Sequence, residues 1–326
     1  MKRSPLWWIL GLTVAIGGIV TLVYRGSWGA AAGAQPRVVL ILKTREASIS
    51  FWNTLRDGAK RAANDLGIDL SIRGPRDEQQ VDEQIGILAS AVDESPAAIV
   101  LAAADFERLI PGIRAARKAG IPVVTVDSFV SSNDANTKIG TDNLTLGRKA
   151  AEAVLRRVPA GAEVGVINYI RESSTGRDRE TGLLSELRNR VALLPTLYCG
   201  ADADVAYRQA KDLLVTHPRL GGLVALNEPT SEGVGRALAE AGKARDVVLV
   251  AVDQSFELVK RLEDGTIRDL LVQQPFNMGY LGVQAARDLI DHRHVEPTID
   301  TGSVDIDLKT LFQPRNQKLL FPFSEE

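Results

Sequence analysis

Residues 121–127 read IPVVTVD, an apolar run rich in β-branched side chains that ends on one polar residue, Asp127. Three more apolar runs of strand length end in the same way, GLVALN at Asn227, VVLVAVD at Asp253 and LLVQQ at Gln273. In open α/β folds, ligands bind at the carboxyl ends of the strands. These endings therefore predict a polar rim around one binding site.

From Arg37 onward, such runs alternate with amphipathic helical patterns, which is typical of βαβ units around a parallel sheet. The first series predicts strands at 37–43, 69–73, 97–103 and 121–126 and helices near 51–66, 77–92 and 106–119. The second predicts strands at 162–168, 194–199, 220–226 and 246–252 and helices near 143–158, 176–190, 203–217, 230–242 and 255–264. We expect an α/β protein with two doubly wound, Rossmann-like parallel sheets.

No Pro/Gly/Ser-rich linker separates the two series, so we expect strands to run directly from one domain into the other. The first crossing is expected at 137–143, with Asn143 capping the next helix. The second is expected near Gln273–Pro275, because proline cannot extend a central strand. The third is expected near Val304–Ile306, after a helix at about 276–292 has returned to the first domain. Three parallel strands of this kind would form a hinge.

The expected domains follow from these crossings. Residues 35–142 plus 275–304 form the N-terminal lobe, and residues 143–274 plus 305–326 form the C-terminal lobe. The tail 309–326 carries Leu319, Leu320, Phe321 and Phe323, which we expect to pack on the second domain.

The charge balance excludes a nucleic-acid-binding surface. The 326 residues contain 39 basic and 41 acidic side chains, and no Lys/Arg-rich run follows the extreme N-terminus. The single cysteine, Cys199, excludes an intrachain disulfide and a CxxC site.

The first 34 residues have the pattern of an export signal. Lys2 and Arg3 precede an apolar stretch at 7–24, and small residues that a signal peptidase could cut fill 29–34. The stretch approaches the roughly 20 residues that span a bilayer, so a retained membrane anchor stays open beside a cleaved signal. No cysteine follows the apolar core, which excludes a lipoprotein.

From about Arg37 to Leu308 the chain resembles the type I periplasmic sugar-binding proteins, the ribose-binding-protein-like receptors of ABC transporters. The matching segments are FWNTLRDGAKRAANDLG (51–67), IPVVTVD (121–127), IGTDN (139–143), GRDRETG (176–182), LNEPTSEGVGRAL (226–238), VAVDQ (250–254) and VQQP (272–275). They occur in the order of that family. The resemblance implies two lobes that close on a sugar around a hinge.

The resemblance also implies a set of sugar contacts. The residues assigned to sugar hydroxyls are Asp127, Arg177, Asn227, Asp253 and Gln273. The pair Phe51 and Trp52 is assigned to stacking on the sugar ring. Ribose receptors carry an arginine after the first of these aspartates, whereas Ser128 stands here, so the resemblance does not point to ribose itself.

The chemistry of these side chains suits a sugar. Carboxylates accept from hydroxyls, Arg donates, Asn and Gln do both, and aromatic rings cover the apolar C–H faces. Each residue also has a structural alternative. Asp127, Asn227 and Asp253 can cap helices, Arg177 can lie on a solvated helix face, and Gln273 can be a polar strand end at the hinge. Phe51 and Trp52 can both be core, and they point about 100° apart on a helix.

No enzyme motif is present: the sequence has no HExxH, no GxSxG and no P-loop, and it suggests no metal or cofactor. It also begins without the helix-turn-helix of a lactose-repressor-type regulator. We therefore expect a monomeric, extracytoplasmic substrate-binding protein, soluble in the periplasm or anchored by residues 7–24. It would deliver a monosaccharide (pentose or hexose) or related polyol to an ABC permease. The alternative is a membrane-anchored sugar sensor that presents its closed state to a signalling partner.

Overall fold

A computed structural model describes residues 35–321, and the chain from Pro36 onward forms one compact unit. The predicted signal or anchor, including the apolar stretch 7–24, lies outside the described residues. Between residues 35 and 321, no helix combines the length and the apolar character needed to cross a membrane.

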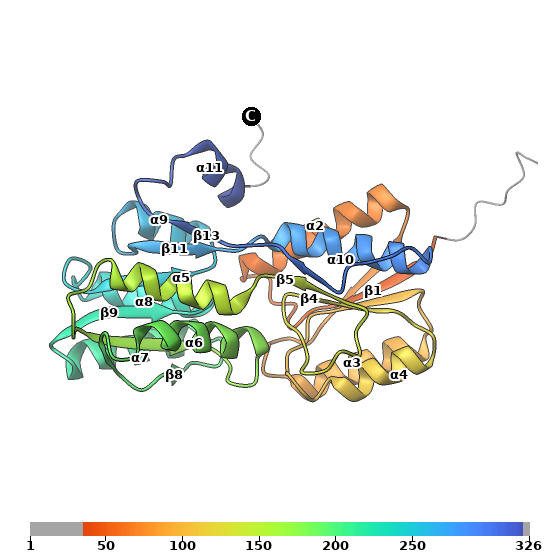
Figure 1. Ribbon diagram of the computed structural model, residues 1–326, viewed down its shortest axis with the longest axis horizontal. Coiled ribbons are helices and arrows are strands. Elements are labelled where there is room, and N and C mark those ends of the chain that lie inside the picture. The colour runs from red at the N-terminus through yellow and green to blue at the C-terminus, as the bar shows by residue number, and fades with distance from the viewer. Residues whose placement is uncertain (1–34, 322–326) are drawn as a thin grey trace, which may run out of the picture. The chain divides into compact units, whose positions relative to one another are not determined.

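The first sheet has six strands, all parallel to their neighbours, in the order β12-β5-β4-β3-β1-β2. Its strands are β1 (Arg37–Ile41), β2 (Asp69–Arg73), β3 (Ala98–Leu101), β4 (Val123–Val126), β5 (Thr137–Gly140) and β12 (Thr298–Asp300). Its helices are α2 (Ser50–Leu66), α3 (Val81–Asp93), α4 (Ile110–Lys118) and α10 (Pro275–Ile290). These elements are called the first lobe below (Figure 1).

Helices cover both faces of this sheet, which explains why its central strands are apolar throughout. Val38 and Leu40 of β1 belong to the core shared with α2 and α10. Val39 and Ile41 belong to the core shared with α3 and α4. The alternation along one strand thus supplies two separate cores.

The pair α2 and α10 packs with its backbones in contact. A Cβ added at Gly279 would lie 1.9 Å from the carbonyl oxygen of Leu55, and one at Gly58 would lie 2.0 Å from the carbonyl oxygen of Phe276. Only glycine permits this approach, so these two positions tie the late helix α10 to the first lobe, as the sequence predicted.

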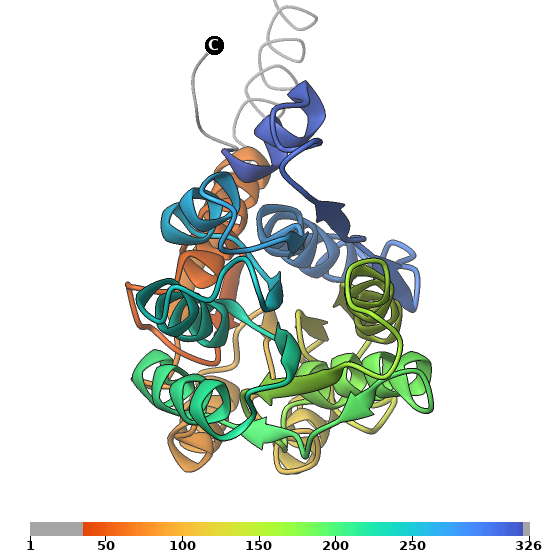
Figure 2. The same cartoon turned by 90° about the vertical axis from the view of Figure 1, so that its left-hand side faces the viewer.

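The second sheet has the order β13-β11-β10-β9-β6-β7, with β8 also paired to β6. Its strands are β6 (Glu163–Asn168), β7 (Ala192–Leu193), β8 (Leu197–Tyr198), β9 (Leu220–Ala225), β10 (Val248–Val252), β11 (Asp269–Val272) and β13 (Val304–Ile306). Its helices are α5 (Asn143–Leu155), α6 (Ser174–Leu187), α7 (Ala203–Thr216), α8 (Glu228–Glu240), α9 (Phe256–Glu263) and α11 (Pro314–Leu320). In this second lobe α5 packs against α6 and α7 against α8, and helices flank the sheet on both sides (Figure 2).

One predicted strand differs from the structure. The expected strand 194–199 is replaced by two short strands, β7 and β8, on either side of Pro195. Proline lacks the N–H that a continuous strand needs for its ladder, so the strand breaks there.

The chain crosses between the two sheets at the three expected places, between β5 and α5, between β11 and α10, and between β12 and β13. Two details were wrong. The cap of α5 is Asp142, whose side chain accepts from the N–H of Thr145, and Asn143 is the first helical residue. In addition, the third crossing strand was expected to be parallel, but β13 is antiparallel to β11. Its first residue, Val304, pairs with Val272, the last residue of β11. The exact lobe bounds given above remain a prediction.

The C-terminal tail packs where it was expected. Leu320 joins the buried core of the second sheet, and Leu319 and Phe321 pack against that core. The side-chain amide of Gln254 donates to the carbonyl oxygen of Leu319 at 3.2 Å. Phe323 lies outside the described residues.

Candidate functional site

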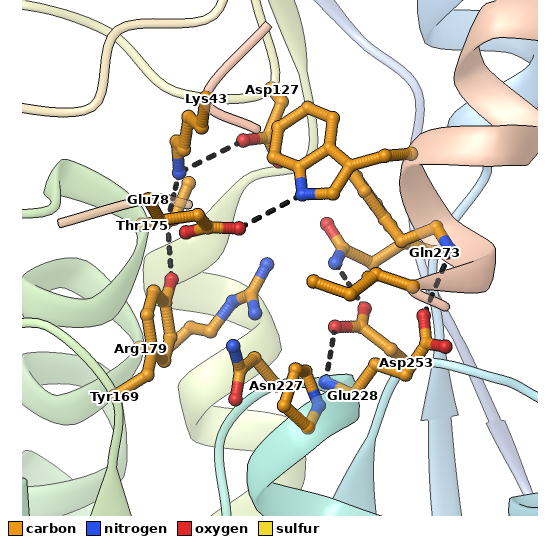
Figure 3. A pocket seen from close by; sticks show the side chains of 14 residues that line it. Lys43, Glu78, Asp127, Tyr169, Thr175, Arg179, Asn227, Glu228, Asp253 and Gln273 are labelled. Carbon is orange, nitrogen blue, oxygen red and sulfur yellow. Dashed lines mark hydrogen bonds and ion pairs between the residues drawn. The ribbon is translucent and has the colours of Figure 1, made fainter. Parts of the chain in front are cut away.

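The carboxyl ends of strands from both sheets meet at one partly open cavity with a free volume of about 30 Å³. The fourteen lining residues are Lys43, Ile49, Phe51, Trp52, Glu78 and Asp127 from the first lobe, and Tyr169, Thr175, Arg179, Asn227, Glu228, Pro229, Asp253 and Gln273 from the second lobe and its hinge end (Figure 3).

Six of the seven predicted contact residues line this cavity. They are Phe51, Trp52, Asp127, Asn227, Asp253 and Gln273. The seventh, Arg177, does not. Its side chain is exposed, and its guanidinium lies 4.1 Å from the centroid of the Phe106 ring in the first lobe.

Arg179 enters the cavity in place of Arg177. Successive residues of a helix are rotated by about 100° about its axis. Two residues that are two positions apart therefore lie on nearly opposite faces of the helix. Since α6 begins at Ser174, its phase buries Arg179 and turns Arg177 outward. This helical phase decides which arginine lines the cavity, and the motif GRDRETG does not reveal it.

The protein orients Arg179 with two hydrogen bonds. Its Nε donates to Oδ1 of Asn143 at 2.8 Å, and Nη1 donates to the carbonyl oxygen of Leu226 at 2.7 Å. Burial lowers the pKa of Arg179, but Tyr169, Asp253, Asp127 and Glu78 together raise it by more, so the net shift of the pKa is upward and the group stays charged. Nη2 has no partner among residues 35–321, and the guanidinium points into the cavity (Figure 3).

Lys43 and Asp127 form a buried ion pair, with 3.1 Å between Nζ and Oδ2. Lys43 Nζ also donates to the hydroxyls of Ser173 (3.3 Å) and Thr175 (3.4 Å), which belong to the second lobe. Burial lowers the pKa of Lys43, while Asp127 and Glu78 raise it, and the net shift is upward. A charged lysine that lines the cavity therefore links the two lobes.

Asp253 is held by the hinge and by α8. Nε2 of Gln273 donates to its Oδ1 at 2.5 Å, and the N–H of Glu228 donates to its Oδ2 at 3.0 Å. Burial raises the pKa of Asp253, and Arg179 opposes that shift. Oε1 of Gln273 is buried without a partner in the described part of the chain.

Asn227 is both a helix cap and a lining residue. Its Oδ1 accepts from the N–H of Thr230 at 3.2 Å and from the hydroxyl of the same residue. Its Nδ2 faces no hydrogen-bond partner within residues 35–321. Asn227 therefore caps α8 and also lines the cavity, which are the two alternatives that the sequence left open.

The two aromatic residues are likewise both core and lining. Their ring centroids lie 5.0 Å apart at 87°, and both side chains are buried. Nε1 of Trp52 donates to Oε1 of Glu78 at 2.9 Å, which fixes the indole. Burial raises the pKa of Glu78, against the influence of Lys43.

The sequence interpretation missed several lining residues. Lys43 comes two residues after β1 and ends the apolar run 37–43, and Tyr169 directly follows β6, so both fit the pattern of polar strand endings. Glu78 lies in the irregular connection before α3, and no pattern in the neighbouring sequence indicates that it lines the cavity. Among the described residues, no group of three or more His, Cys, Asp or Glu side chains is placed to hold a metal ion.

The chain is similar to known binding proteins in sequence and in fold. Residues 38–294 match a family model described as a periplasmic binding protein domain. A D-ribose/D-allose-binding protein of Pseudomonas aeruginosa is 27% identical over 265 residues, which are 78% of this chain and 82% of that protein. An ABC transporter solute binding protein from Agrobacterium vitis with bound D-fucose superposes with a TM-score of 0.84 at 29% identity, covering 87% of this chain and 99% of the other. A carbohydrate transporter solute binding protein from Agrobacterium radiobacter, in complex with D-arabinose, also gives 0.84, at 27% identity and with coverage of 89% and 100%.

Proposed function

This chain belongs to the family of periplasmic binding proteins, and from that membership we propose that it captures a monosaccharide by hinge closure and delivers it to an ABC importer. The ligand is a pentose or hexose, or a related polyol. The protein acts in the periplasm or at the extracytoplasmic face.

One observation carries the proposal: the cavity presents both donors and acceptors that the protein itself leaves without partners. Nη2 of Arg179 and Nδ2 of Asn227 are donors with no partner between residues 35 and 321, and Oε1 of Gln273 is a buried acceptor in the same condition. Oδ1 of Asp127 and Oε2 of Glu78 add two carboxylate acceptors. A sugar hydroxyl donates and accepts at once, so a ring of hydroxyls can satisfy all of these atoms.

The groups come from both lobes, which supports capture by closure. Asp127 and Glu78 belong to the first lobe, and Arg179 and Asn227 to the second, so neither lobe alone provides the full set. A ligand that bridges the lobes stabilises the closed population. Each hydroxyl that a wrong sugar fails to supply leaves a buried polar atom without a partner, at about 1–3 kcal/mol.

The aromatic rings and Ser128 bear on which sugar binds. Phe51 and Trp52 offer apolar surface for the C–H face of a sugar ring. Ser128 turns away from the site, with its hydroxyl donating to the carbonyl oxygen of Ala103 at 2.7 Å. The position that is arginine in ribose receptors thus contributes no donor to the cavity here.

Transport is favoured over the alternatives. Two of the relatives named above are solute binding proteins of transporters, so a role as a membrane-anchored sensor is not favoured. The same relatives are binding proteins rather than enzymes, in keeping with a site built for recognition. The ABC permease and the monomeric state are parts of the proposal.

Isothermal titration calorimetry of residues 35–326 tests it, with D-ribose, D-allose, D-fucose and D-arabinose first and other pentoses, hexoses and polyols next. A sugar held at 100 times its dissociation constant is expected to raise stability by about 2.7 kcal/mol in a parallel thermal-shift assay. If no sugar or polyol in the panel binds, the proposal is wrong.

A further inference from the structure

Glu228 joins the second lobe to the beginning of helix α2 in the first. Its Oε1 accepts from the backbone N–H of Ser50 at 2.7 Å, and its Oε2 accepts from that of Phe51 at 2.8 Å. These are the first two residues of α2, whereas Glu228 is the first residue of α8. Glu228 is 1% exposed, and its hydrogen bond to Phe51 is buried, whereas the one to Ser50 is half-buried.

Helix α2 has no cap of its own. The residue at its N-cap position is Ile49, which has no side chain able to accept a hydrogen bond, and no acidic residue lies in the first turn. By contrast, α5, α7, α8 and α9 are capped by their own Asp142, Asp202, Asn227 and Ser255. The first N–H groups of a helix carry partial positive charge and favour a carboxylate. Glu228 supplies that carboxylate from the opposite lobe.

The same residue is linked to the ligand-facing set. The backbone N–H of Glu228 donates to Asp253, which in turn is held by Gln273 at the hinge. The two N–H groups that its carboxylate binds belong to the turn that carries Phe51 and Trp52. One residue therefore contacts the polar side of the site through its backbone and the aromatic side through its side chain.

We propose that Glu228 is a positioning residue of the closed form, a latch that caps α2 only when the lobes are together and thereby slows the release of bound sugar. The inference rests on the proposed function, because it requires a cleft that opens and closes. In the open form, water takes the place of Glu228 at Ser50 and Phe51. Closure exchanges that water for a contact in which both side-chain oxygens of Glu228 meet backbone N–H groups of α2, and this contact holds the aromatic side of the cavity against the ligand.

Two substitutions test the latch from its two sides. Glu228→Gln keeps the size of the side chain but leaves one acceptor oxygen for two N–H groups. Ser50→Pro removes one of those N–H groups at a position where proline is favoured, the first residue of a helix. Ile49 has φ −88° and ψ 110°, an extended conformation that a following proline accepts. Gln79→Ala is the matched control, since exposed Gln79 also bonds across the lobes, from Nε2 to the carbonyl oxygen of Gly200 at 3.0 Å.

The measurement is the dissociation rate of the tightest-binding of D-ribose, D-allose, D-fucose and D-arabinose, followed by stopped-flow fluorescence on the compact unit from Pro36 onward. Glu228→Gln and Ser50→Pro are each expected to raise this rate about tenfold. The double variant should rise less than the product of the two effects. Gln79→Ala should change the rate by less than about threefold. The melting temperature without sugar should stay unchanged in Glu228→Gln and unchanged or higher in Ser50→Pro, which a purely structural role of the contact would not allow.

The outcomes separate the two proposals. If the wild type binds sugar but both variants release it at the wild-type rate, or if the two effects multiply fully, the latch is wrong and the proposed function stands. Equal losses of melting temperature without sugar in both variants would also overturn the latch. If the wild type binds no sugar, both proposals are wrong.

Discussion

Asp127 and Asp253 occupy equivalent places in the two lobes. Each directly follows the last residue of a central strand, each has a left-handed backbone (φ 59° and 76°), and each donates its N–H to the neighbouring strand at 2.9 Å, to Ile139 and Leu271. Asp tolerates this conformation better than most residues. The repeated geometry brings a carboxylate into the shared cavity from each lobe.

Two substitutions at Asp253 should separate the effect of its charge on sugar binding from the effect of its backbone conformation on stability. Asp253→Asn keeps a residue that tolerates positive φ, removes the charge and is expected to weaken sugar binding about tenfold or more. Asp253→Val places a β-branched residue at φ 76° and should lower the free energy of unfolding by roughly 1–3 kcal/mol more than Asp253→Asn does. Calorimetry and chemical denaturation measure the two effects. Equal stability of the two variants would contradict the conformational argument.

Arg177 and Arg179 form a matched pair on one helix. Arg179→Ala removes the buried guanidinium that faces the cavity and should lower sugar affinity at least about 100-fold, because buried acceptors then lose a charged donor. Arg177→Ala removes an exposed guanidinium and should leave affinity within about threefold of the wild type. Titration calorimetry compares them. The reverse order of effects would return the assignment to Arg177.

Trp52 should report closure by itself. The chain has four tryptophans, and the other three, Trp7, Trp8 and Trp28, precede residue 35. In residues 35–326, Trp52 is thus the sole indole, and it is 2% exposed in the structure. Sugar binding should shift its emission to shorter wavelength as the cleft dries. A spectrum that saturating sugar leaves unchanged would argue that Trp52 is already sealed without ligand.

Sugar affinity should depend on pH through Glu228. Burial raises the pKa of Glu228 to about 8, while the N–H groups of Phe51 and Ser50 lower it and Asp253 and Glu232 raise it further. A raised pKa means that the closed form binds the proton more tightly than an open form in which Glu228 is hydrated. Its contribution to closure is then complete below the ordinary value near 4.5 and is lost as pH rises through about 8.

Calorimetry in buffers of different ionisation enthalpy tests the direction of this pH dependence. At neutral pH, binding should take up part of a proton, and affinity should fall from pH 6 to pH 9. Glu228→Gln should reduce both the uptake and the slope. The pKa values of Glu78 and Asp253 are also raised by burial, so some dependence should remain in that variant.

The close packing of α2 and α10 predicts opposite effects of two glycine substitutions. Gly279→Ala places a Cβ 1.9 Å from the Leu55 carbonyl oxygen and should lower the unfolding free energy by about 1–3 kcal/mol or more. Gly86→Ala lies within α3 with open space around it and should raise that energy by up to about 1 kcal/mol. Thermal unfolding of both variants measures this. Similar melting temperatures for the two would contradict the packing argument.

The amino-acid sequence by itself determined the two-sheet architecture and most of the rim. Apolar runs buried on both faces end where the sheet ends, so Asp127, Asn227, Asp253 and Gln273 could be placed at the cavity from their positions alone. The return of α10 to the first lobe was also visible, because Pro275 stops the preceding strand. These features depend on local patterns, which a linear sequence carries in full.

Only the tertiary structure decided which side chains line the cavity and which contacts join the two lobes. The choice of Arg179 over Arg177 depends on the residue at which α6 begins, and Glu78 lies in a connection that has no periodic pattern. The contact of Glu228 with Ser50 joins residues 178 positions apart. From the sequence, Glu228 at the start of α8 would be expected to interact with the dipole of its own helix. In the structure, the uncapped start of α2 lies against it, and Glu228 links the two lobes.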